Sequence, residues 1–216
     1  VSILGYSELL IADGEQLPGE RVVEMAQCIN RAGQRLHHLV ENLLIYAQIE
    51  VLRVTPERVK ALRRLQYAYP RALLKHLAEE KAQQVGRSAD LGLYLNDVEA
   101  VQIIEDNLRK IVAELLDNAF KFSRPGTPVQ VSTFTENGHY ILQISDRGRG
   151  MTAEQIASIG AYTQFDRKFY EQQGAGLGLV IAKHLTELHG GWLHIESQLE
   201  VGTTVQAALP LATTPS

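Results

Sequence analysis

The N-terminal part of the chain carries apolar residues at a regular helical spacing. From residue 20 to about residue 50 no proline interrupts the pattern, and apolar positions recur every seven residues. They form two series, Val22, Ile29, Leu36 and Leu43 and, three positions later, Met25, Ala32, Leu39 and Tyr46. This a/d repeat predicts a long helix with the apolar seam of a coiled coil or helix bundle. An amphipathic helix packed on its own domain is the alternative.

A shorter apolar stretch, from Val1 to about Ile11, predicts a second helix before the long one. The segment between them, from Asp13 to Gly19, is rich in turn-forming residues. Because two antiparallel helices cannot bury such a seam alone, we expect two chains to pair into a four-helix bundle. Residues 1–53 are therefore predicted to form a helical hairpin, half of a dimeric four-helix bundle.

After Thr55-Pro56 the pattern changes to a mixture of helical and strand-like segments. The predicted helices cover residues 56–85 (one or two helices), 101–122, 151–159 and a stretch from residue 177. The predicted strands cover residues 91–95, 129–135, 139–145, 192–197 and 204–209. The Asn137-Gly138 step is a strong hairpin signal. Helices on one face of a mixed sheet make residues 54–212 an α/β sandwich, so the chain is predicted as α+β, with a frayed tail at residues 213–216.

One motif of this second domain lies on the predicted long helix. Residues 114–121 read Glu-Leu-Leu-Asp-Asn-Ala-Phe-Lys, which places Glu114, Asn118 and Lys121 on one helix face. Mg²⁺ prefers hard oxygen ligands and keeps several waters, and a lysine supplies a point charge. A carboxylate, an amide oxygen and an ammonium group on one face therefore suit a hydrated Mg²⁺ ion and a polyphosphate.

Two glycine-containing turns follow this helix. Residues 146–150 read Asp-Arg-Gly-Arg-Gly directly after a predicted strand, and residues 174–179 read Gly-Ala-Gly-Leu-Gly-Leu at the start of a helical pattern. Backbone N–H groups at such a helix start can hold an anion. Each motif alone is common, but the three together describe a nucleotide site.

The three motifs resemble the N, G1 and G2 boxes of the Bergerat-type ATP-binding fold, in its sensor histidine kinase branch. Residues 5–10, Gly-Tyr-Ser-Glu-Leu-Leu, resemble the stretch after the phosphoacceptor histidine box of these kinases. Residues 201–205, Val-Gly-Thr-Thr-Val, resemble the turn before their last strand. The resemblance covers nearly the whole chain. It implies phosphorylation of a histidine that depends on ATP and Mg²⁺, followed by transfer to an aspartate of a response regulator.

The resemblance also implies a role for each matched residue. Asn118 would ligate Mg²⁺, Glu114 would act on the water shell of the ion, and Lys121 would meet a phosphate. Asp146 would accept a hydrogen bond from the adenine amino group. Further nucleotide contacts are implied for Gly148, Gly150, Gly174, Gly176, Leu177, Gly178 and Thr204.

Two other classes of protein stay open. The Glu-x-x-Asp-Asn pattern at residues 114–118 also fits gyrase- and chaperone-like ATPases, whereas Lys121 and the form of the third motif favour the kinase branch. A non-catalytic dimerisation and nucleotide-binding module is the other alternative. In the kinase branch, residues 160–173 would form a short ATP lid. Its candidate hydrophobic anchors and phosphate-reaching cations are Phe165, Phe169, Arg167 and Lys168.

The phosphoacceptor histidine is not among the matched residues. His37 and His38 lie on the long predicted helix without the Glu-x-x-Thr-Pro context of an acceptor box, so we interpret them as surface positions. The chain opens at Val1 in the middle of an apolar helical pattern. We therefore expect the acceptor box just before Val1, and we expect the chain alone not to autophosphorylate.

Composition limits the partners of the protein. A hydrophobic content of 45%, 21% charged residues and a formal charge of −4 are globular values that give no reason to expect nucleic acid or a membrane surface as a partner. The lone Cys28 excludes an intrachain disulfide and suits a reducing compartment. No apolar run approaches the roughly 18 residues of a membrane span. We expect a cytoplasmic chain, with a membrane anchor elsewhere in a longer parent protein left open, and as partners a second copy and a response-regulator receiver domain.

Overall fold

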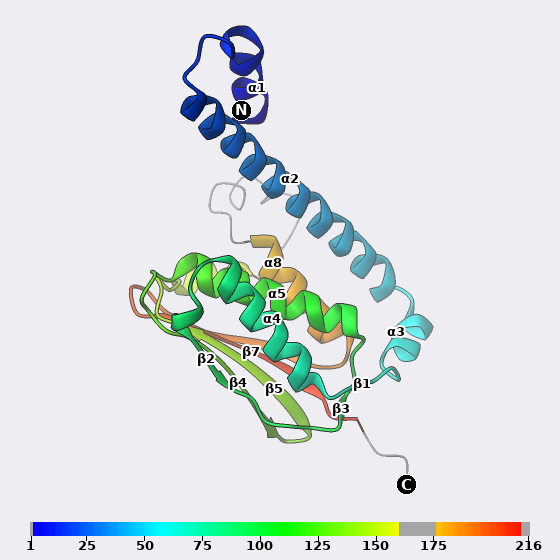
Figure 1. Cartoon of the computed structure of the whole chain (residues 1–216). Coiled ribbons are helices and arrows are strands. Elements are labelled where there is room, and N and C mark those ends of the chain that lie inside the picture. Colours follow the sequence, from blue (N-terminus) through cyan, green and yellow to red (C-terminus); the bar gives the residue numbers. More distant parts are fainter. Residues whose placement is uncertain (1, 160–175, 213–216) are drawn as a thin grey trace. The chain divides into compact units, whose positions relative to one another are not determined.

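Figure 1 shows a computed structural model of the chain, which describes residues 2–159 and 176–212. The chain divides into two compact units, residues 1–47 and residues 48–216. The first unit holds α1 (Ser2–Asp13) and most of α2 (Gly19–Arg53), and the last turns of α2 belong to the second unit. The boundary expected from the sequence, after residue 53, lies within this second unit.

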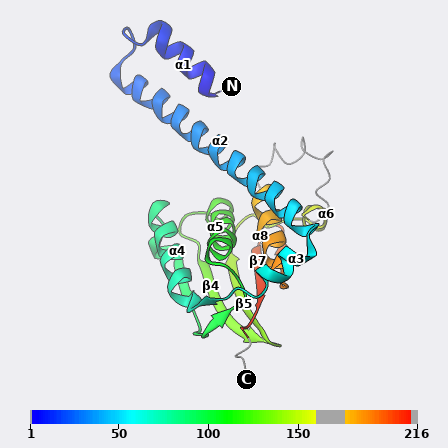
Figure 2. The same cartoon turned by 90° about the vertical axis from the view of Figure 1, so that its right-hand side faces the viewer.

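The first unit is a helical hairpin, in which α1 turns back along α2 (Figure 2). The turn begins at Asp13, whose carbonyl accepts hydrogen bonds from the backbone N–H groups of Gln16 and Leu17, at 2.9 and 3.2 Å. Met25 of the predicted seam is buried, whereas several later seam residues are exposed. The hairpin therefore leaves much of the seam uncovered.

The second unit combines helices and strands as the sequence pattern predicts. Its helices are α3 (Pro56–Leu62), α4 (Pro70–Gln84), the short 3₁₀ helix η1 (Ser88–Asp90), α5 (Glu105–Phe122), α6 (Ala153–Ser158) and α8 (Gly176–Leu188). Its strands are β1 (Tyr67–Ala68), β2 (Leu91–Tyr94), β3 (Ala100–Val101), β4 (Val129–Glu136), β5 (His139–Asp146), β6 (Trp192–Gln198) and β7 (Gly202–Pro210).

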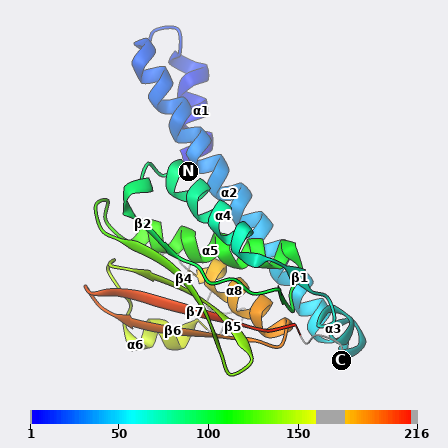
Figure 3. The same cartoon turned by 60° about the horizontal axis from the view of Figure 1, so that its bottom comes forward.

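The main sheet has the strand order β2-β4-β5-β7-β6, and β1 pairs with β3 in a separate two-stranded ribbon. The pair β2–β4 is parallel and the other neighbours are antiparallel, so the sheet is mixed. Helices α4, α5 and α8 cover one of its faces (Figures 1 and 3). The predicted α+β class, with a helical hairpin followed by a Bergerat-type sandwich, is confirmed.

Alternation along the strands separates the two faces of the sheet. Val131 of β4 and Tyr140 and Leu142 of β5 are fully buried under the helices. Their neighbours along the strands point to the other face, where the side chain of Gln206 donates a hydrogen bond to that of Gln143 at 2.8 Å. The core therefore lies between the sheet and the three helices, and the opposite face is largely polar.

The β4–β5 connection is the predicted tight hairpin. Asn137 and Gly138 have positive φ angles of 48° and 76°, and the flanking residues Glu136 and His139 are paired in register. A type I′ turn requires positive φ at both central residues, which an asparagine followed by a glycine accepts at low cost. The turn fixes the register of β5 and with it the end of the strand at Asp146.

One predicted boundary is wrong, and one pair of strands was not predicted. The helix expected from residue 101 begins at Glu105, because Val101 belongs to β3 and the backbone N–H of Gln102 bonds to the Pro210 carbonyl at 2.9 Å. The ribbon of β1 and β3 was not expected at all, since each of its strands has only two residues. The predicted lid (residues 160–173) and tail (213–216) lie outside the described residues. Within the part of the chain that the structure describes, no helix is long and apolar enough to cross a membrane.

Candidate functional site

The first predicted motif lies on α5, on the flank that approaches α8. Glu114 is buried at 4% exposure, Asn118 is half-buried and Lys121 is exposed. Steps of four and three residues keep these side chains on neighbouring turns of one helix face. The apolar residues of α5 pack under the sheet and against the adjacent helices, which fixes the direction in which this face points.

The side chain of Glu114 extends from α5 toward the first turn of α8. Its Oε1 is 2.6 Å from Nζ of Lys110, one turn earlier on the same helix. A Cβ built on Gly178 would lie only 1.9 Å from Oε2 of Glu114. The α8 backbone comes this close because position 178 has no side chain, so the first and third motifs are in direct contact.

Asn118 carries the unsatisfied polar group of this face. Its Nδ2 is buried and has no hydrogen-bond acceptor among the described residues. Leaving such a group unpaired costs roughly 1–3 kcal/mol, so a ligand that supplies an acceptor would be favoured here. The adjacent Asp117 is engaged elsewhere, since its carboxylate forms an ion pair with Lys81 of α4.

The C-terminal end of α5 meets the second motif. The carbonyl of Phe122 accepts a hydrogen bond from the Arg149 backbone N–H at 3.2 Å, and Ser123 forms a β-bridge with Gly148. The Arg149 guanidinium and the Lys121 ammonium lie 4.3 and 5.0 Å from the centroid of the Phe122 ring. The end of α5 and the turn at residues 146–150, called the acidic turn after Asp146, therefore form one wall of the site.

Asp146 ends β5 on the helix-covered face of the sheet. Its Oδ1 accepts a hydrogen bond from the Gly148 backbone N–H at 2.7 Å. Burial raises the pKa of Asp146 to about 6, and hydrogen bonds from the backbone of Gly148 and Thr203 and the charge of Arg87 act in the opposite direction. This carboxyl group is thus partly withdrawn from water and ready to accept a further hydrogen bond.

Two glycines let the β6–β7 turn pack against the backbone of residues 146–150. Gly150 has a φ of 65°, and a Cβ there would lie 2.0 Å from the Gln198 carbonyl oxygen. A Cβ at Gly202, whose φ is 145°, would lie 2.1 Å from the Asp146 carbonyl oxygen. Neither position can carry a side chain without a shift of the backbone, because the opposing atoms belong to main chain.

The predicted contact residue Thr204 lies away from Asp146. Its Oγ1 is 2.9 Å from Oγ of Ser145, its partner in the register, on the open face of the sheet. The residue opposite Asp146 is Thr203, whose Oγ1 is 2.8 Å from Oγ of Ser197. A shift of one residue along a strand changes the face, so Thr203 and not Thr204 shares the face of Asp146.

The third motif forms the beginning of α8. Gly176, Leu177 and Gly178 are its first three residues, so their backbone N–H groups belong to a helix N-terminus. Such groups favour an anion. Gly174 and the predicted lid residues Phe165, Arg167, Lys168 and Phe169 lie outside the described residues.

Several residues at the site were not predicted from the sequence. Lys110 could have been found, because it precedes Glu114 by four residues on a predicted helix. Thr203 and Ser197 depend on the pairing of β6 with β7, and Arg149 depends on contact with α5. No local pattern carries that information.

The donor set fits a metal ion that arrives with a phosphate ligand. Among the described residues no group of three or more His, Cys, Asp and Glu side chains could hold a metal ion. Mg²⁺ is commonly bound through one or two protein oxygens, with phosphate oxygens and water completing its shell. Asn118, with Glu114 one turn away, suits this arrangement.

Comparison with known proteins identifies the family. A family profile described as "Histidine kinase-, DNA gyrase B-, and HSP90-like ATPase" matches residues 103–213, which begin just after β3 and end just beyond β7. The chain belongs to this ATPase family. Within it, the chain groups with the two-component sensor histidine kinases, which confirms the branch predicted from the motifs.

The relatives extend over nearly the whole chain. It is 29% identical over 208 residues to the sensor histidine kinase YvrG of Bacillus subtilis, covering 94% of this chain and 34% of the relative. It is 32% identical over 212 residues to the circadian input-output histidine kinase CikA of Synechococcus elongatus, covering 96% of this chain and 28% of the relative. The chain thus spans about a third of the length of the curated relatives it matches.

A solved structure shares the fold over almost the same range. The histidine kinase AdeS of Acinetobacter baumannii superimposes with a TM-score of 0.67 at 20% identity, covering 98% of this chain and 94% of that one. Helical hairpin and sandwich therefore occur together in a known kinase structure.

Proposed function

We propose that this chain is the kinase core of a two-component sensor histidine kinase. In this proposal it binds ATP with Mg²⁺ and transfers the γ-phosphoryl group to a histidine, from which it passes to an aspartate of a response-regulator receiver domain. One observation carries the proposal. Helix α5 contacts α8 where Glu114 meets Gly178, and its end contacts the acidic turn where Phe122 meets Gly148. Between these two contacts lies Asn118, whose Nδ2 has no hydrogen-bond partner among the described residues.

The proposed base end of the site is Asp146. A half-buried carboxylate beside a glycine-rich turn can accept a hydrogen bond from an adenine amino group. Gly148 and Gly150 let this turn pack closely against the end of α5 and the end of β6. Thr203, on the same face, is the nearest additional candidate for this end.

The proposed phosphate end is formed by α5 and the start of α8. Asn118 would ligate Mg²⁺, Glu114 would act through the water shell, and Lys121 would neutralise phosphate charge. The backbone at Gly176 and Gly178 would receive phosphate oxygens. When bound, Mg²⁺ would supply charge neutralisation on the phosphate oxygens. Phosphoryl transfer asks the protein mainly for positioning and electrostatic stabilisation, which these residues can provide.

Neither histidine of the predicted seam region is the proposed acceptor. Nε2 of His37 lies 3.3 Å from a carboxylate oxygen of Glu41, and Nε2 of His38 lies 3.1 Å from Nδ2 of Asn42. Both contacts are with the next turn of the same helix. Because neither histidine stands in the Glu-x-x-Thr-Pro context of an acceptor box, we propose that the acceptor is a histidine outside this chain. We also propose that the exposed seam of α2 pairs with a second copy.

Isothermal titration calorimetry with ADP, with and without Mg²⁺, tests the site. Asn118→Asp should reduce the Mg²⁺-dependent gain in affinity, and Asp146→Asn should weaken binding about tenfold or more under both conditions, because the adenine loses a charged acceptor. Asn30→Asp on α2 and Asp97→Asn near β2 are matched controls, since both positions are exposed.

The outcomes separate the parts of the proposal. Unchanged affinity in both site variants would remove the site assignment. Sustained ATP hydrolysis without phosphate transfer to any histidine, in a protein extended upstream through an acceptor box, would favour the gyrase- and chaperone-like alternative. Acid-labile, alkali-stable phosphate on the extended protein would support the kinase.

A further inference from the structure

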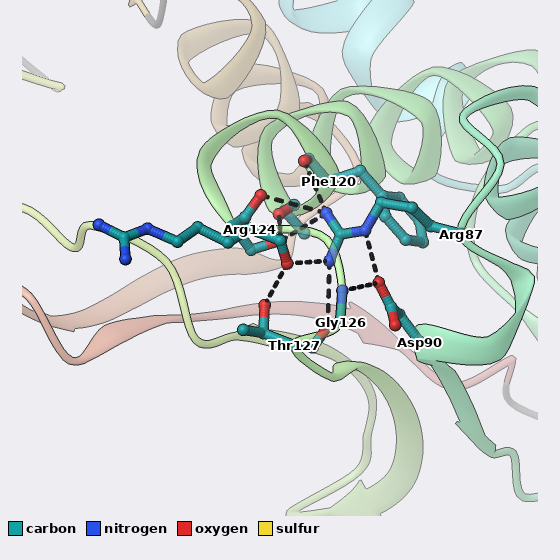
Figure 4. Close-up of polar contacts among 8 residues, drawn as sticks. Arg87, Asp90, Phe120, Arg124, Gly126 and Thr127 are labelled. Atoms are coloured by element: carbon teal, nitrogen blue, oxygen red, sulfur yellow. Dashed lines mark hydrogen bonds and ion pairs between the residues drawn. The ribbon is translucent and has the colours of Figure 1, made fainter.

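Arg87 is a buried arginine outside the three motifs. It lies between α4 and β2, directly before η1, and is only 7% exposed. Burying a guanidinium is costly unless each of its N–H groups finds a partner. Figure 4 shows that it is surrounded by acceptors from a segment more than thirty residues away in the sequence.

The guanidinium binds the end of α5 and the loop after it. Nη1 donates to the carbonyl of Phe120 at 2.9 Å and to the carbonyl and hydroxyl oxygens of Ser123 at 3.2 and 2.9 Å. Nη2 donates to the carbonyls of Arg124 and Thr127 at 2.8 and 3.0 Å. A positive charge at the C-terminal carbonyls of a helix is also favourable to the helix dipole.

Asp90 holds the arginine and the same loop at once. Its Oδ2 accepts a hydrogen bond from Nε of Arg87 at 2.6 Å and another from the Gly126 backbone N–H at 3.0 Å. These two hydrogen bonds, led by that from Arg87, lower the pKa of Asp90. The guanidinium also lies over the Phe120 ring, 5.2 Å from its centroid. The segment from Phe120 to Thr127 is thus fixed from several directions.

The Phe120–Thr127 segment also packs directly against the acidic turn. Ser123 bridges Gly148, and the Phe122 carbonyl accepts the Arg149 backbone N–H. A Cβ on Gly148 would lie 2.3 Å from the Phe122 carbonyl oxygen, so the two backbones are in close contact. Gly148 in turn donates its N–H to the Asp146 carboxylate. A displacement of the loop would therefore be transmitted to Asp146.

We propose that Arg87 is a positioning residue for recognition of the adenine amino group. It acts through the Phe120–Thr127 segment and Gly148 on the Asp146 carboxylate, without touching the nucleotide itself. The proposal rests on the proposed function, in which Asp146 accepts a hydrogen bond from adenine.

The charge of Arg87 supports the same role. Burial is the largest influence on Asp146 and raises its pKa, and the Arg87 guanidinium lowers it, together with the hydrogen bonds from Gly148 and Thr203. The ionised carboxylate is the form that accepts a hydrogen bond at both oxygens. Arg147 and Arg149 are the other charged residues of this turn, and both are exposed.

The test compares ADP with inosine diphosphate, in which an oxo group replaces the amino group of adenine, over pH 5 to 8. Arg87→Gln removes the charge and most of the donors, and Arg87→Lys keeps the charge with fewer donors. Arg71→Gln is the matched control, because Arg71 at the start of α4 forms an exposed ion pair with Asp97. Urea unfolding of each variant defines conditions under which all are folded.

The wild-type protein and Arg71→Gln should prefer ADP by about tenfold or more and lose that preference as pH falls through about 6. Arg87→Gln should lose most of the preference and shift its pH midpoint upward. Arg87→Lys should keep the midpoint and recover part of the preference.

Two results would overturn the proposal. One is a folded Arg87→Gln protein whose ratio of ADP to inosine diphosphate affinity, and the pH midpoint of that ratio, are the same as in wild type. The other is an equal loss of both ligands, which a purely structural role would give. If the wild-type protein binds neither nucleotide, the proposed function fails and the positioning role fails with it. If the wild-type protein discriminates between the two nucleotides and the Arg87 variants discriminate equally well, the positioning role alone is wrong.

Discussion

Helices α2 and α5 carry the same kind of amphipathic pattern, but the apolar face of α5 is buried and much of that of α2 is exposed. In α5, Leu108, Ile111 and Val112 are all 0% exposed. In α2, Leu36, Leu39 and Leu43 are 53, 48 and 42% exposed. The periodicity that predicts a helix and its apolar face is equally clear in both. Among the described residues, the apolar face of α5 is covered, whereas much of that of α2 is not.

The difference shows what each helix contributes. The apolar face of α5 is buried in the core, which fixes the orientation of the helix. Its remaining flank can therefore hold Glu114 and Asn118 in fixed positions. On α2 the seam residues Leu36, Leu39 and Leu43 stay exposed, and a run of exposed apolar residues is typical of an interaction surface. We propose that a second copy covers it.

The largest expected effect is on the proposed pairing of α2. Leu36→Glu would place a charge in an apolar seam, which costs several kcal/mol if the position is buried in a dimer. We expect the dimer to become undetectable by light scattering at concentrations where the wild-type protein dimerises. Gln34→Glu, which adds the same charge outside the seam, should leave the mass unchanged. Equal masses for all three proteins at high concentration would count against pairing through this helix.

A cavity in α5 should reduce stability strongly. Ile111→Ala is expected to lower the free energy of unfolding by roughly 2–5 kcal/mol, because the site is fully buried. Urea unfolding followed by the fluorescence of Trp192, the only tryptophan, reports on this unit. Leu36→Ala in α2, measured at low concentration, should change the same quantity by less than about 0.5 kcal/mol. Similar losses in both variants would mean that α2 is covered within the monomer.

A buried histidine beside α5 should make stability depend on pH. Nε2 of His189, which is 0% exposed, lies 2.9 Å from Nδ2 of Asn107 on the first turn of α5. Burial, with a smaller effect of Arg63, lowers the pKa of His189 from 6.5 to about 4. Between these values the unfolded chain binds the proton and the folded chain does not. The contribution of His189 to the free energy of unfolding is therefore complete above pH 6.5, and it falls by about 3 kcal/mol as pH drops to about 4.

Asp146 acts in the opposite direction over an overlapping range. Its folded-state pKa is raised from 3.8 to about 6, so its contribution to stability decreases as pH rises between these values. The difference between wild-type and His189→Gln unfolding curves isolates the histidine, because Asp146 is common to both. Parallel curves for wild type and His189→Gln would contradict the assignment.

The smallest effects come from one substitution made in two helices. At Gly33 of α2 an added Cβ meets nothing within 4 Å, so Gly33→Ala should stabilise the helix by roughly 0.5–1 kcal/mol. At Gly178 of α8 the Cβ would collide with the Glu114 carboxylate, which Lys110 holds in place. Gly178→Ala should therefore lose about 1 kcal/mol net despite its better helix propensity. Thermal unfolding by circular dichroism would measure both, and a gain at both positions would show that Glu114 moves freely.

Much of the fold could be predicted because its signals are local. The hairpin at Asn137-Gly138 follows from the positive φ angles that this dipeptide accepts. The placement of Glu114 and Asn118 on one face of α5 follows from helical spacing alone. The first residues of α8 follow from a glycine-rich turn before an apolar helical pattern. Their roles in nucleotide binding remain predictions.

The parts that could not be predicted depend on pairing between distant segments. The two-residue strands β1 and β3 are too short to leave a pattern, and they exist because they pair with each other. Thr204 and Thr203 are neighbours in sequence, and only the register of β5 with β7 decides which one shares the face of Asp146.

Local sequence patterns predict most of the helices and strands, the hairpin turn, the spacing of the motif residues and the family of the chain. These features depend on residues a few positions apart, where backbone geometry sets the period. Only the tertiary structure decided which apolar faces are covered and which polar groups are paired. Arg87 illustrates the reason: most of its hydrogen-bond acceptors are backbone carbonyl groups, which every residue has, so no side-chain pattern in the sequence marks them.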